Sequence, residues 1–302
     1  MINPQQFETL DALDSSAWLS ELRGIMQQDL WPNECGRCQT VESIGNKSIR
    51  QHALDNHVKN KIAHSDYLVL SGVLDNICNS ACQTCNENLS TKIGSLKSKN
   101  YIKINNASRI DSIPLDRVTQ IDINGGEPSA SPSYLQLLDQ LPPNVRYLRL
   151  NTNGSRVIKV LPDLIKKGIE VTVTVSLDGI GNTHDYVRWP IKWDNVERTI
   201  RDYQSMELYE LNTWTTVSAL NINNLKNIQE YTSKHGIKHS WALLEQPEVL
   251  NIRNRNYLTN AADVPDELTH IVASAADNSL ELQNFINEQD QLRGIQFKDY
   301  FQ

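Results

Sequence analysis

Six short runs rich in β-branched residues alternate with five amphipathic stretches of helical length through the middle of the chain. We expect strands at Tyr67–Val73, Val118–Asn124, Val145–Asn151, Ile169–Ser176, Asn212–Leu220 and Ile237–Leu244. The intervening helices are expected near 87–98, 132–141, 157–167, 191–206 and 224–235. Connections of this length favour parallel strands joined by right-handed crossovers. The pattern predicts an α/β fold, either an α/β barrel, a partial barrel or an open doubly wound sheet, with ligands at the carboxyl ends of the strands.

The repeating unit covers only part of the 302 residues, which suggests three segments. Residues 1–64 form an N-terminal extension, with a helix around 15–29 followed by a polar, irregular piece that contains Cys35 and Cys38. Residues 65–250 hold the βα repeat, and residues 251–302 form a C-terminal segment with two acidic helices near 265–276 and 279–292. A chain of this length with 39% hydrophobic residues can bury a sizeable core.

The charge balance argues against nucleic acid as a partner. Lys and Arg number 29 against 36 acidic residues, for a net charge of -7. Most of the excess lies in residues 263–302, which hold eight acidic and two basic residues. The sequence shows neither an apolar run of about 18 residues, as a membrane span requires, nor a signal peptide, so we expect a cytoplasmic protein.

All five cysteines fall between Cys35 and Cys85. Three of them, Cys78, Cys82 and Cys85, have a C-x3-C-x2-C spacing in the loop that follows the first expected strand. Three thiolates this close together can bind one face of an iron–sulfur cube and leave its fourth iron without a protein ligand. The alternative is a set of buried or zinc-binding cysteines, although structural zinc usually requires four ligands.

The next three expected strands also end in polar residues and glycine. These ends are Gly125-Gly126-Glu127-Pro128, Asn151-Thr152-Asn153-Gly154 and Ser176-Leu177-Asp178-Gly179. Each could be an ordinary turn, but three at the same edge as the cysteine loop indicate a binding site. The glycines would let the backbone approach a ligand, and the Glu127 carboxylate could accept a hydrogen bond from an ammonium group.

With these motifs, residues 65–250 resemble the radical S-adenosylmethionine (SAM) superfamily, and more narrowly its twitch/SPASM-like members. The resemblance implies a partial (β/α)6 TIM-like barrel and a 4Fe–4S cluster on Cys78, Cys82 and Cys85, with SAM bound to the fourth iron. It implies that Gly125, Gly126 and Glu127 meet the SAM amino group, Ser176 its ribose or carboxylate, and Arg188 its carboxylate. The implied SAM-binding set also includes Asn153, Asp178 and, from the fifth strand, Asn221. The sequence departs from the family at Thr84, where many members have an aromatic residue beside the adenine.

The pair Cys35 and Cys38 lies in a stretch that resembles the N-terminal region of twitch-type radical enzymes, in which Trp-Pro-x-x-Cys-x-x-Cys is followed by Glu, Ser and Arg. The last three correspond here to Glu42, Ser48 and Arg50. With His52 and His57 the pair approaches a Cys2His2 zinc spacing. A zinc site, an auxiliary iron–sulfur cluster shared across a dimer and a metal-free pair all remain open.

The expected function is reductive cleavage of SAM to a 5′-deoxyadenosyl radical that abstracts hydrogen from a substrate, as an oxidoreductase or transferase. A peptide or protein side chain is favoured as substrate, because an acidic C-terminal segment suits a basic or neutral peptide. The alternatives are a sugar, a nucleotide or another small metabolite, or a non-catalytic metal-binding scaffold. Lys92, Lys97, Lys99 and Lys103 could bind a flavodoxin- or ferredoxin-like reductant, or simply form a solvated helix face. His184 and Asp185 are expected to be turn and cap residues.

Overall fold

The computed structural model describes residues 12, 15–43, 45, 47–48, 50–51, 54–55, 68–97, 101–106, 115–254, 263–273 and 279–301. The chain divides into two compact units, one made of residues 1–69 and 107–120, the other of residues 70–106 and 121–302. The division into segments 1–64, 65–250 and 251–302 remains a prediction. In the described part of the chain, no helix has the length and apolar character needed to cross a membrane.

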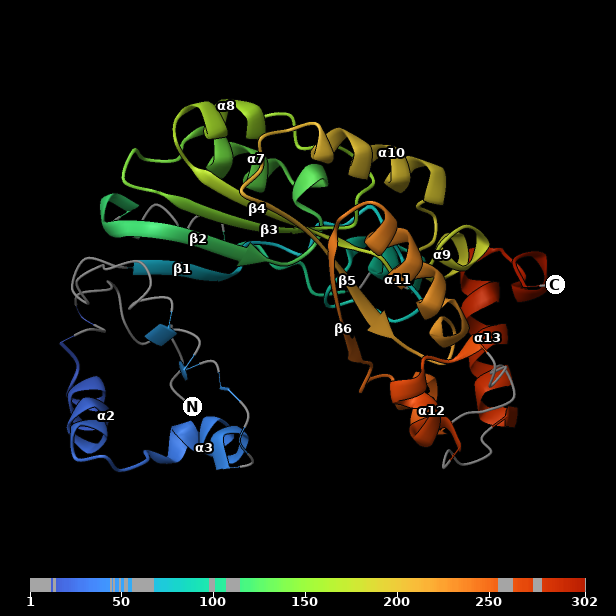
Figure 1. The fold of residues 1–302 in the computed structure, drawn as a ribbon, viewed down its shortest axis with the longest axis horizontal. Helices are drawn as coiled ribbons and strands as arrows, with labels where there is room; N and C mark the ends of the chain where they lie inside the picture. The colour runs from blue at the N-terminus through green and yellow to red at the C-terminus, as the bar shows by residue number, and fades with distance from the viewer. Residues whose placement is uncertain are drawn as a thin grey trace. The chain divides into compact units, whose positions relative to one another are not determined.

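A six-stranded sheet with the order β1-β2-β3-β4-β5-β6 forms the framework of the fold (Figure 1). Its strands are β1 (Leu68–Val73), β2 (Val118–Asn124), β3 (Tyr147–Thr152), β4 (Glu170–Ser176), β5 (Glu210–Val217) and β6 (Lys238–Leu243). β3, β4, β5 and β6 pair in parallel along the sheet. Because each strand lies beside its sequence neighbour and β6 does not pair with β1, this is the partial (β/α)6 barrel arrangement, and the closed barrel and the doubly wound order are excluded.

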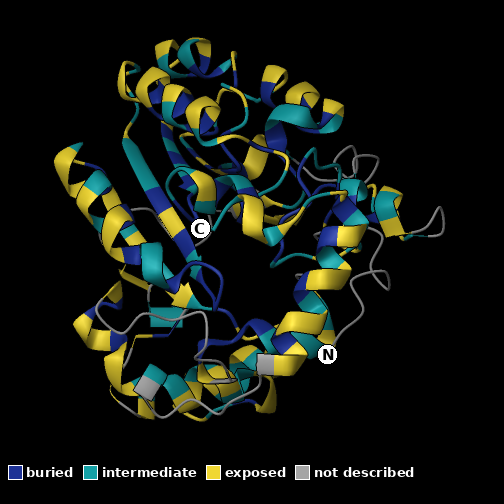
Figure 2. Cartoon of the chain, turned by 90° about the vertical axis from the view of Figure 1, so that its right-hand side faces the viewer, coloured by how far each residue is buried: buried dark blue, intermediate teal, exposed yellow. Residues whose placement is uncertain are grey.

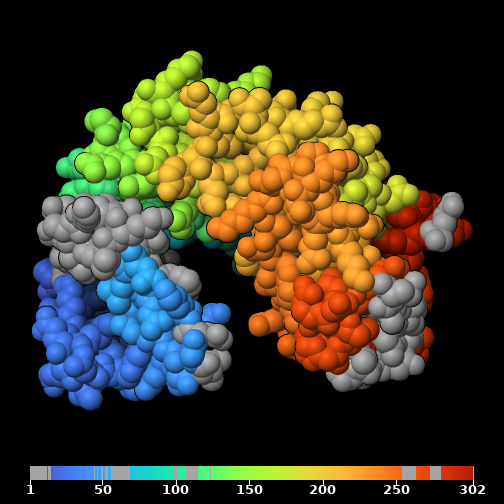
Figure 3. Space-filling view, in the orientation of Figure 1, coloured from blue at the N-terminus to red at the C-terminus, as the bar shows by residue number. Residues whose placement is uncertain are grey.

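Helices follow the strands as the periodicity predicts, although each is shorter than expected. They are α5 (Thr91–Lys97), α7 (Pro132–Asp139), α8 (Leu161–Lys166), α10 (Trp193–Gln204) and α11 (Leu225–Lys234). α7 begins where the Ser131 hydroxyl accepts a hydrogen bond from the Tyr134 amide at 3.1 Å, with Pro132 in the first turn. α7, α8 and α10 lie on one face of the sheet, and Figure 3 shows the surface that they present to solvent.

The core lies between this helical layer and the sheet. Along β4, Val171, Val173 and Val175 are fully buried, whereas the residues between them are partly exposed. Leu148 and Leu150 of β3 stand in register with Val171 and Val173, so they add to the same buried face. Burial of each such side chain contributes about 1.5–3 kcal/mol. The alternation of buried and exposed positions is visible along the strands and helices in Figure 2.

Two elements differ from the sequence-based expectation. A short helix, α9 (Asn182–Val187), follows β4 where only loop was expected. The stretch around Cys35 and Cys38 is helical rather than irregular, because a 3-10 turn (Asn33–Cys35) leads directly into α3 (Gly36–Ser43). α2 (Ala17–Gln27) lies within the expected 15–29 helix.

The C-terminal segment contains α12 (Asp266–Ala273) and α13 (Ser279–Arg293), close to the expected bounds. Leu282 and Ile286 of α13 are buried with Tyr186, Val187 and residues of the turns after β5 and β6. This helix therefore packs on the same part of the fold that carries the carboxyl ends of β4, β5 and β6.

Candidate functional site

The loop that carries Cys78, Cys82 and Cys85 begins directly after β1 and is held on one side by the start of α5. The Thr91 hydroxyl accepts from the Cys78 amide at 3.1 Å and donates to the Cys78 carbonyl at 3.3 Å. The buried Ser90 hydroxyl donates to the Ser80 carbonyl at 2.6 Å. These bonds stabilise a stretch of backbone that has no regular secondary structure of its own.

The other side of the loop is held by α9 and the residues that follow it. The Ala81 amide donates to the Trp189 carbonyl at 2.7 Å, and the Gln83 amide donates to the Val187 carbonyl at 2.8 Å. The sequence analysis did not detect this second support. Six helical residues are too few for the period of an amphipathic helix to be recognised.

Two of the three thiols, Cys78 and Cys85, lie in an environment that disfavours their charge in the free protein. Burial, with the neighbouring Cys82 thiolate as the next cause, raises the pKa of Cys78 to about 11 and that of Cys85 to about 12. The Arg188 guanidinium acts in the opposite direction on both. In the part of the chain that the structure describes, no three His, Cys, Asp or Glu side chains are grouped around the position of a single metal ion.

Three thiolates on one loop suit three corners of an iron–sulfur cube, whereas structural zinc usually takes four ligands. A cube is wider than one ion and takes its ligands at separate corners, so its three thiolates stand further apart than zinc ligands do. Cys78, Cys82 and Cys85 lie on one loop, and their thiols are close enough to influence one another's charge. Three thiolates also leave one iron without a protein ligand, as cofactor binding requires.

Gly125 and Gly126, which follow β2, allow a close approach between two segments of the protein itself. A Cβ atom on Gly126 would lie 2.0 Å from the Ile77 carbonyl oxygen, and one on Gly125 would lie 2.5 Å from that of Asp75. Gly125 also has a φ of 120°, which other residues rarely adopt. These glycines therefore pack against the backbone that leads into the cysteine loop, a role that sequence reasoning did not foresee.

Glu127 is fully buried, and its carboxylate is held by three hydrogen-bond donors. Oε1 accepts from the Ser129 amide at 3.0 Å and the Thr152 hydroxyl at 2.7 Å, and Oε2 accepts from the Asn153 amide at 2.6 Å. Among the described residues, no Lys, Arg or His forms an ion pair with it. The described part of the chain thus surrounds this buried carboxyl group with hydrogen-bond donors but provides no cation for it.

Asn153, at the end of β3, links that strand to the cysteine loop. Its side-chain amide donates to Asn79 Oδ1 at 2.8 Å, and Asn79 in turn donates to the Ser155 hydroxyl at 3.0 Å. Because Asn79 directly follows Cys78, these bonds fix the loop against the β3 edge of the site.

Arg188 follows α9 and forms a buried ion pair with Asp178, which lies just beyond β4. Nη1 is 2.5 Å from Asp178 Oδ2, and Asp178 Oδ1 accepts from the Thr216 amide at 2.8 Å. Burial opposes the charge of Arg188, but Cys82 and Asp178 outweigh it and raise the pKa of the guanidinium. Its Nε is buried and has no hydrogen-bond partner among the described residues. This free donor fits an acidic group on a bound cofactor.

Ser176 and Asn221, two other residues expected to bind SAM, differ in their burial and hydrogen bonds. Ser176 ends β4 and is partly exposed. Asn221 is buried, donates to the carbonyls of Asp178 and Thr216 at 3.0 Å each, and accepts from the Ser218 amide at 2.7 Å. In this structure Asn221 joins the turn after β5 to the one after β4.

His184 and Asp185 of α9 have different roles. Asp185 accepts from the Trp193 amide at 2.7 Å at the start of α10 and pairs with Lys192 at 2.9 Å, which confirms its expected capping role. His184 is fully buried instead. Its ring nitrogens have no hydrogen-bond partner among the described residues, and burial lowers its pKa to about 3.

In the unit made of residues 1–69 and 107–120, the cysteine pair lies beside a small polar network. Glu42 accepts from the Ser48 hydroxyl and from Arg50 Nη2, each at 2.5 Å, and the Arg50 guanidinium lies 4.9 Å from the centre of the Trp31 ring. Arg50, followed by Ser48, lowers the pKa of Glu42. The structure thus brings together the Glu, Ser and Arg of the N-terminal motif.

Cys35 and Cys38 are partly exposed free thiols in this unit. His52 and His57, the other expected ligands of a second metal, lie outside the described residues.

Two of the lysines considered for reductant binding make contacts within the protein. Lys97 pairs with Glu87 at 2.8 Å, and Lys92 lies 5.7 Å from the centre of the Trp189 ring. Lys99 lies outside the described residues.

Comparison with known proteins finds no matching family model but two related sequences. Both are mycofactocin maturase MftC, from two strains of Mycobacterium tuberculosis, and each is 23% identical over 171 residues. The aligned region covers 56% of this chain and 42% of each maturase, so the chain spans less than half the length of these curated relatives. At this identity and coverage, the match does not by itself assign the chain to a family. It does not distinguish the twitch/SPASM subgroup.

Among solved structures, the chain is similar to Streptococcus suis SuiB bound to S-adenosylmethionine, with a TM-score of 0.48 and 15% identity. That superposition covers 89% of this chain and 60% of SuiB. The radical S-adenosylmethionine methyltransferase TsrM from Kitasatospora setae, solved with cobalamin and a [4Fe-4S] cluster, matches with a TM-score of 0.41 and 14% identity over 58% of this chain and 34% of TsrM.

Proposed function

We propose that this chain is a radical SAM enzyme that binds a 4Fe–4S cluster through Cys78, Cys82 and Cys85. When bound, the reduced cluster supplies the electron that cleaves SAM to methionine and a 5′-deoxyadenosyl radical, which abstracts hydrogen from the substrate. The protein's part is to hold the cluster at an open edge of the sheet and to orient the cofactor beside it.

The observation that carries this proposal is a pair of side chains beside the cysteine loop, a buried carboxylate and an arginine with an unused donor. Among the described residues, Glu127 has no cation beside it, and Arg188, although paired with Asp178, has a buried Nε without an acceptor. The methionine part of SAM carries an ammonium group, which could pair with Glu127, and a carboxylate, which could accept a hydrogen bond from Arg188 Nε. In a low-dielectric site, such complementary charges favour one orientation of the ligand.

The other residues of the site would shape this binding edge. Gly125 and Gly126 bring the chain after β2 against the segment that leads into the cysteine loop, and their backbone would meet the cofactor amino group. Ser176 would meet the ribose or carboxylate. Asn153, Asp178 and Asn221 would act by holding the loops in place, because their polar atoms bond to Asn79, Arg188 and neighbouring backbone.

For the substrate, we propose a peptide or protein side chain, acted on in the cytoplasm with electrons from a flavodoxin- or ferredoxin-like protein. Two features support a polar substrate. Residues 263–302 carry a net charge of -6, which attracts basic segments. On the partly exposed face of the sheet, Asn151, Thr174 and Asn212 stand in register, and each can form hydrogen bonds.

The test is metal analysis of the anaerobically reconstituted protein together with three single substitutions, Cys78→Ala, Cys82→Ala and Cys85→Ala. The wild type should hold about four iron and four sulfide ions at this loop and produce 5′-deoxyadenosine from SAM. Each substitution should remove that cluster and the product. The matched control is Cys38→Ala, a cysteine of the other unit, which should retain both.

Two results would contradict the proposal. One is a wild-type protein that binds zinc alone, which would support the metal-binding scaffold. The other is any of the three loop variants still making 5′-deoxyadenosine. If the wild type binds more metal than one cluster contains, and Cys38→Ala loses that additional metal, the protein has a second metal site at Cys35 and Cys38.

A further inference from the structure

The C-terminal helix α13 contributes a buried arginine to the cysteine loop. Arg293, its last residue, donates from Nε to the Ala81 carbonyl at 2.8 Å and from Nη2 to the Cys82 carbonyl at 3.1 Å. These two carbonyls belong to adjacent residues between the first and third cysteines. Contacts across 211 and 212 sequence positions bring a residue of the C-terminal segment to the cysteine loop.

Arg293 is fixed on its own side as well. Nη1 donates to the carbonyl and to the side-chain oxygen of Gln289, at 3.1 and 2.6 Å. The helix ends immediately after it at Gly294, which has a φ of 66° and so terminates the helix at this position. A planar guanidinium held on three nitrogens has little freedom to turn away from the loop.

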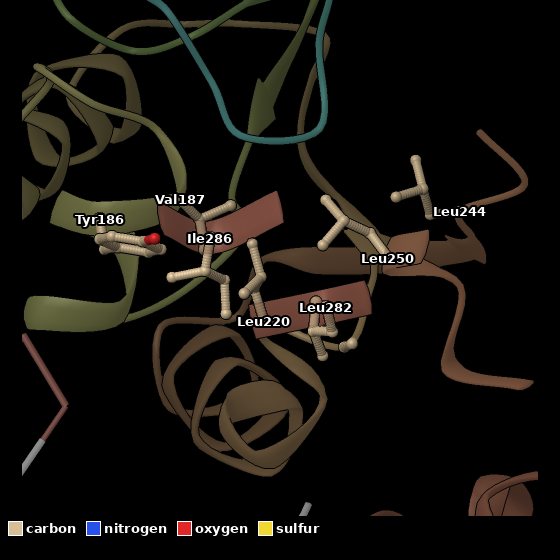
Figure 4. Close-up of a cluster of buried hydrophobic side chains, with 8 residues drawn as sticks. Tyr186, Val187, Leu220, Leu244, Leu250, Leu282 and Ile286 are labelled. Carbon is tan, nitrogen blue, oxygen red and sulfur yellow. The ribbon is translucent and has the colours of Figure 1, made fainter. Parts of the chain in front are cut away.

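The helix that carries Arg293 is anchored to the same support that holds the loop from α9. Leu282 and Ile286 pack with Tyr186 and Val187 in one buried cluster, as Figure 4 shows. Asp290 accepts from the Tyr186 hydroxyl at 2.8 Å and from the Phe297 amide at 2.5 Å. Movement of α13 is therefore coupled to α9 and, through α9, to the loop.

The charge of Arg293 has no carboxylate partner. The side chain belongs to a residue that is 5% exposed, and among the described residues it forms no ion pair. Asp290 is nearby, but both of its oxygens bond to other groups. Arg188, by contrast, is paired with Asp178. Burial lowers the pKa of Arg293, and the nearby Cys82, Asp290 and Cys85 act in the opposite direction. A negatively charged group held by the cysteines would therefore stabilise this buried charge further.

We propose that Arg293 is a positioning residue for the iron–sulfur cluster: it fixes the Ala81–Cys82 backbone and supplies a positive charge to the cluster held by the three thiolates. This inference rests on the proposed function. Reduction adds one negative charge to the cluster, so a fixed cation beside the loop favours the reduced form and raises the midpoint potential. Its two donated bonds keep the middle cysteine in place when the cluster is absent or exchanging.

The test compares the wild type with Arg293→Met, Arg293→Lys and a control, Glu288→Gln, after anaerobic reconstitution. Methionine keeps much of the apolar volume but removes the charge and all four hydrogen bonds. Lysine keeps the charge but cannot donate to both carbonyls with the geometry of the guanidinium. Glu288 is exposed on the same helix, so its substitution changes the net charge by the same size without touching the loop.

The measurements are the cluster midpoint potential and the rate at which a chelator removes iron. Arg293→Met should shift the potential to a more negative value and speed iron loss on the order of tenfold, the scale for groups that support metal ligands. Arg293→Lys should restore the potential but not the slow iron loss. Glu288→Gln should match the wild type in both.

Several outcomes would overturn the inference. A folded Arg293→Met protein with wild-type potential and iron release would refute both parts of the role. If Arg293→Met does not fold, Arg293→Lys decides, because wild-type iron release from it excludes a positioning role. If the wild type binds no iron–sulfur cluster, the proposed function itself is refuted. If the wild type binds the cluster and cleaves SAM, but Arg293→Met has the same potential and iron release, only the role of Arg293 is refuted.

Discussion

Replacing Glu127 by Gln changes one atom of a buried group and tests how the carboxyl end of β2 is stabilised. The substitution preserves an oxygen that can accept from the Ser129 amide and the Thr152 hydroxyl. The other oxygen becomes an NH2 group, which faces the Asn153 amide that donates to Oε2 at 2.6 Å. Two donors then face each other inside the protein.

The expected cost follows from these contacts. Loss of one hydrogen bond to a charged acceptor costs about 1.5–3 kcal/mol, and a buried donor without a partner costs about 1–3 kcal/mol. These contributions overlap, and removal of a buried charge offsets part of them. We therefore expect Glu127→Gln to lower the free energy of unfolding by about 2–3 kcal/mol.

Urea unfolding followed by circular dichroism measures this change, provided that the m-values of the variants agree. Two controls separate the causes. Glu170→Gln makes the same substitution at an exposed position of β4 and should stay within about 0.5 kcal/mol of the wild type. Thr152→Val removes one donor to the carboxylate, and the acceptor of the Gly154 amide, but leaves the charge, and should cost about 1.5–3 kcal/mol. A Glu127→Gln protein as stable as the wild type would refute the reasoning, because burial of the charge would then outweigh its hydrogen bonds.

Two further predictions concern His184 and the N-terminal cysteines. Burial lowers the pKa of His184 to about 3, so below about pH 6.5 the unfolded chain binds a proton that the folded chain does not. Stability should therefore fall as the pH drops from 7 to 5, with His184 contributing about 2 kcal/mol of the loss, and His184→Leu should remove that part of the slope; an unchanged slope would contradict the burial argument. The double substitution Cys35→Ser with Cys38→Ser should leave SAM cleavage and the loop cluster intact while removing any second metal, and a folded double mutant without the loop cluster would show that the two cysteine groups are not separate.

The order of strands and helices follows from local sequence pattern. A strand buried on its helical face, such as β4, shows alternating valines, and a stretch of ten or more residues between strands leaves room for a crossover helix. Parallel crossovers then bring all the carboxyl ends to one edge. For this reason the sequence alone could place the cysteine loop, the residues around Glu127 and those around Asp178 at the same edge of the sheet.

Short elements could not be predicted in the same way. α9 has six residues, fewer than two turns, and its role depends on the carbonyls of Val187 and Trp189 meeting the amides of the cysteine loop. Backbone carbonyls are the same in every residue, so no side-chain pattern reveals which of them will be used.

The sequence by itself determined the βα repeat, the cysteine spacing and the edge at which the polar residues gather, because these depend on neighbours in the chain. Only the tertiary structure decided which partners they meet: that Glu127 is enclosed by Thr152 and Asn153, and that Arg293 binds carbonyls more than two hundred residues away. Such contacts depend on how the C-terminal helix packs, through Leu282 and Ile286, on the turns after β5 and β6. Packing of this kind is set by the shape of the whole core rather than by any local pattern.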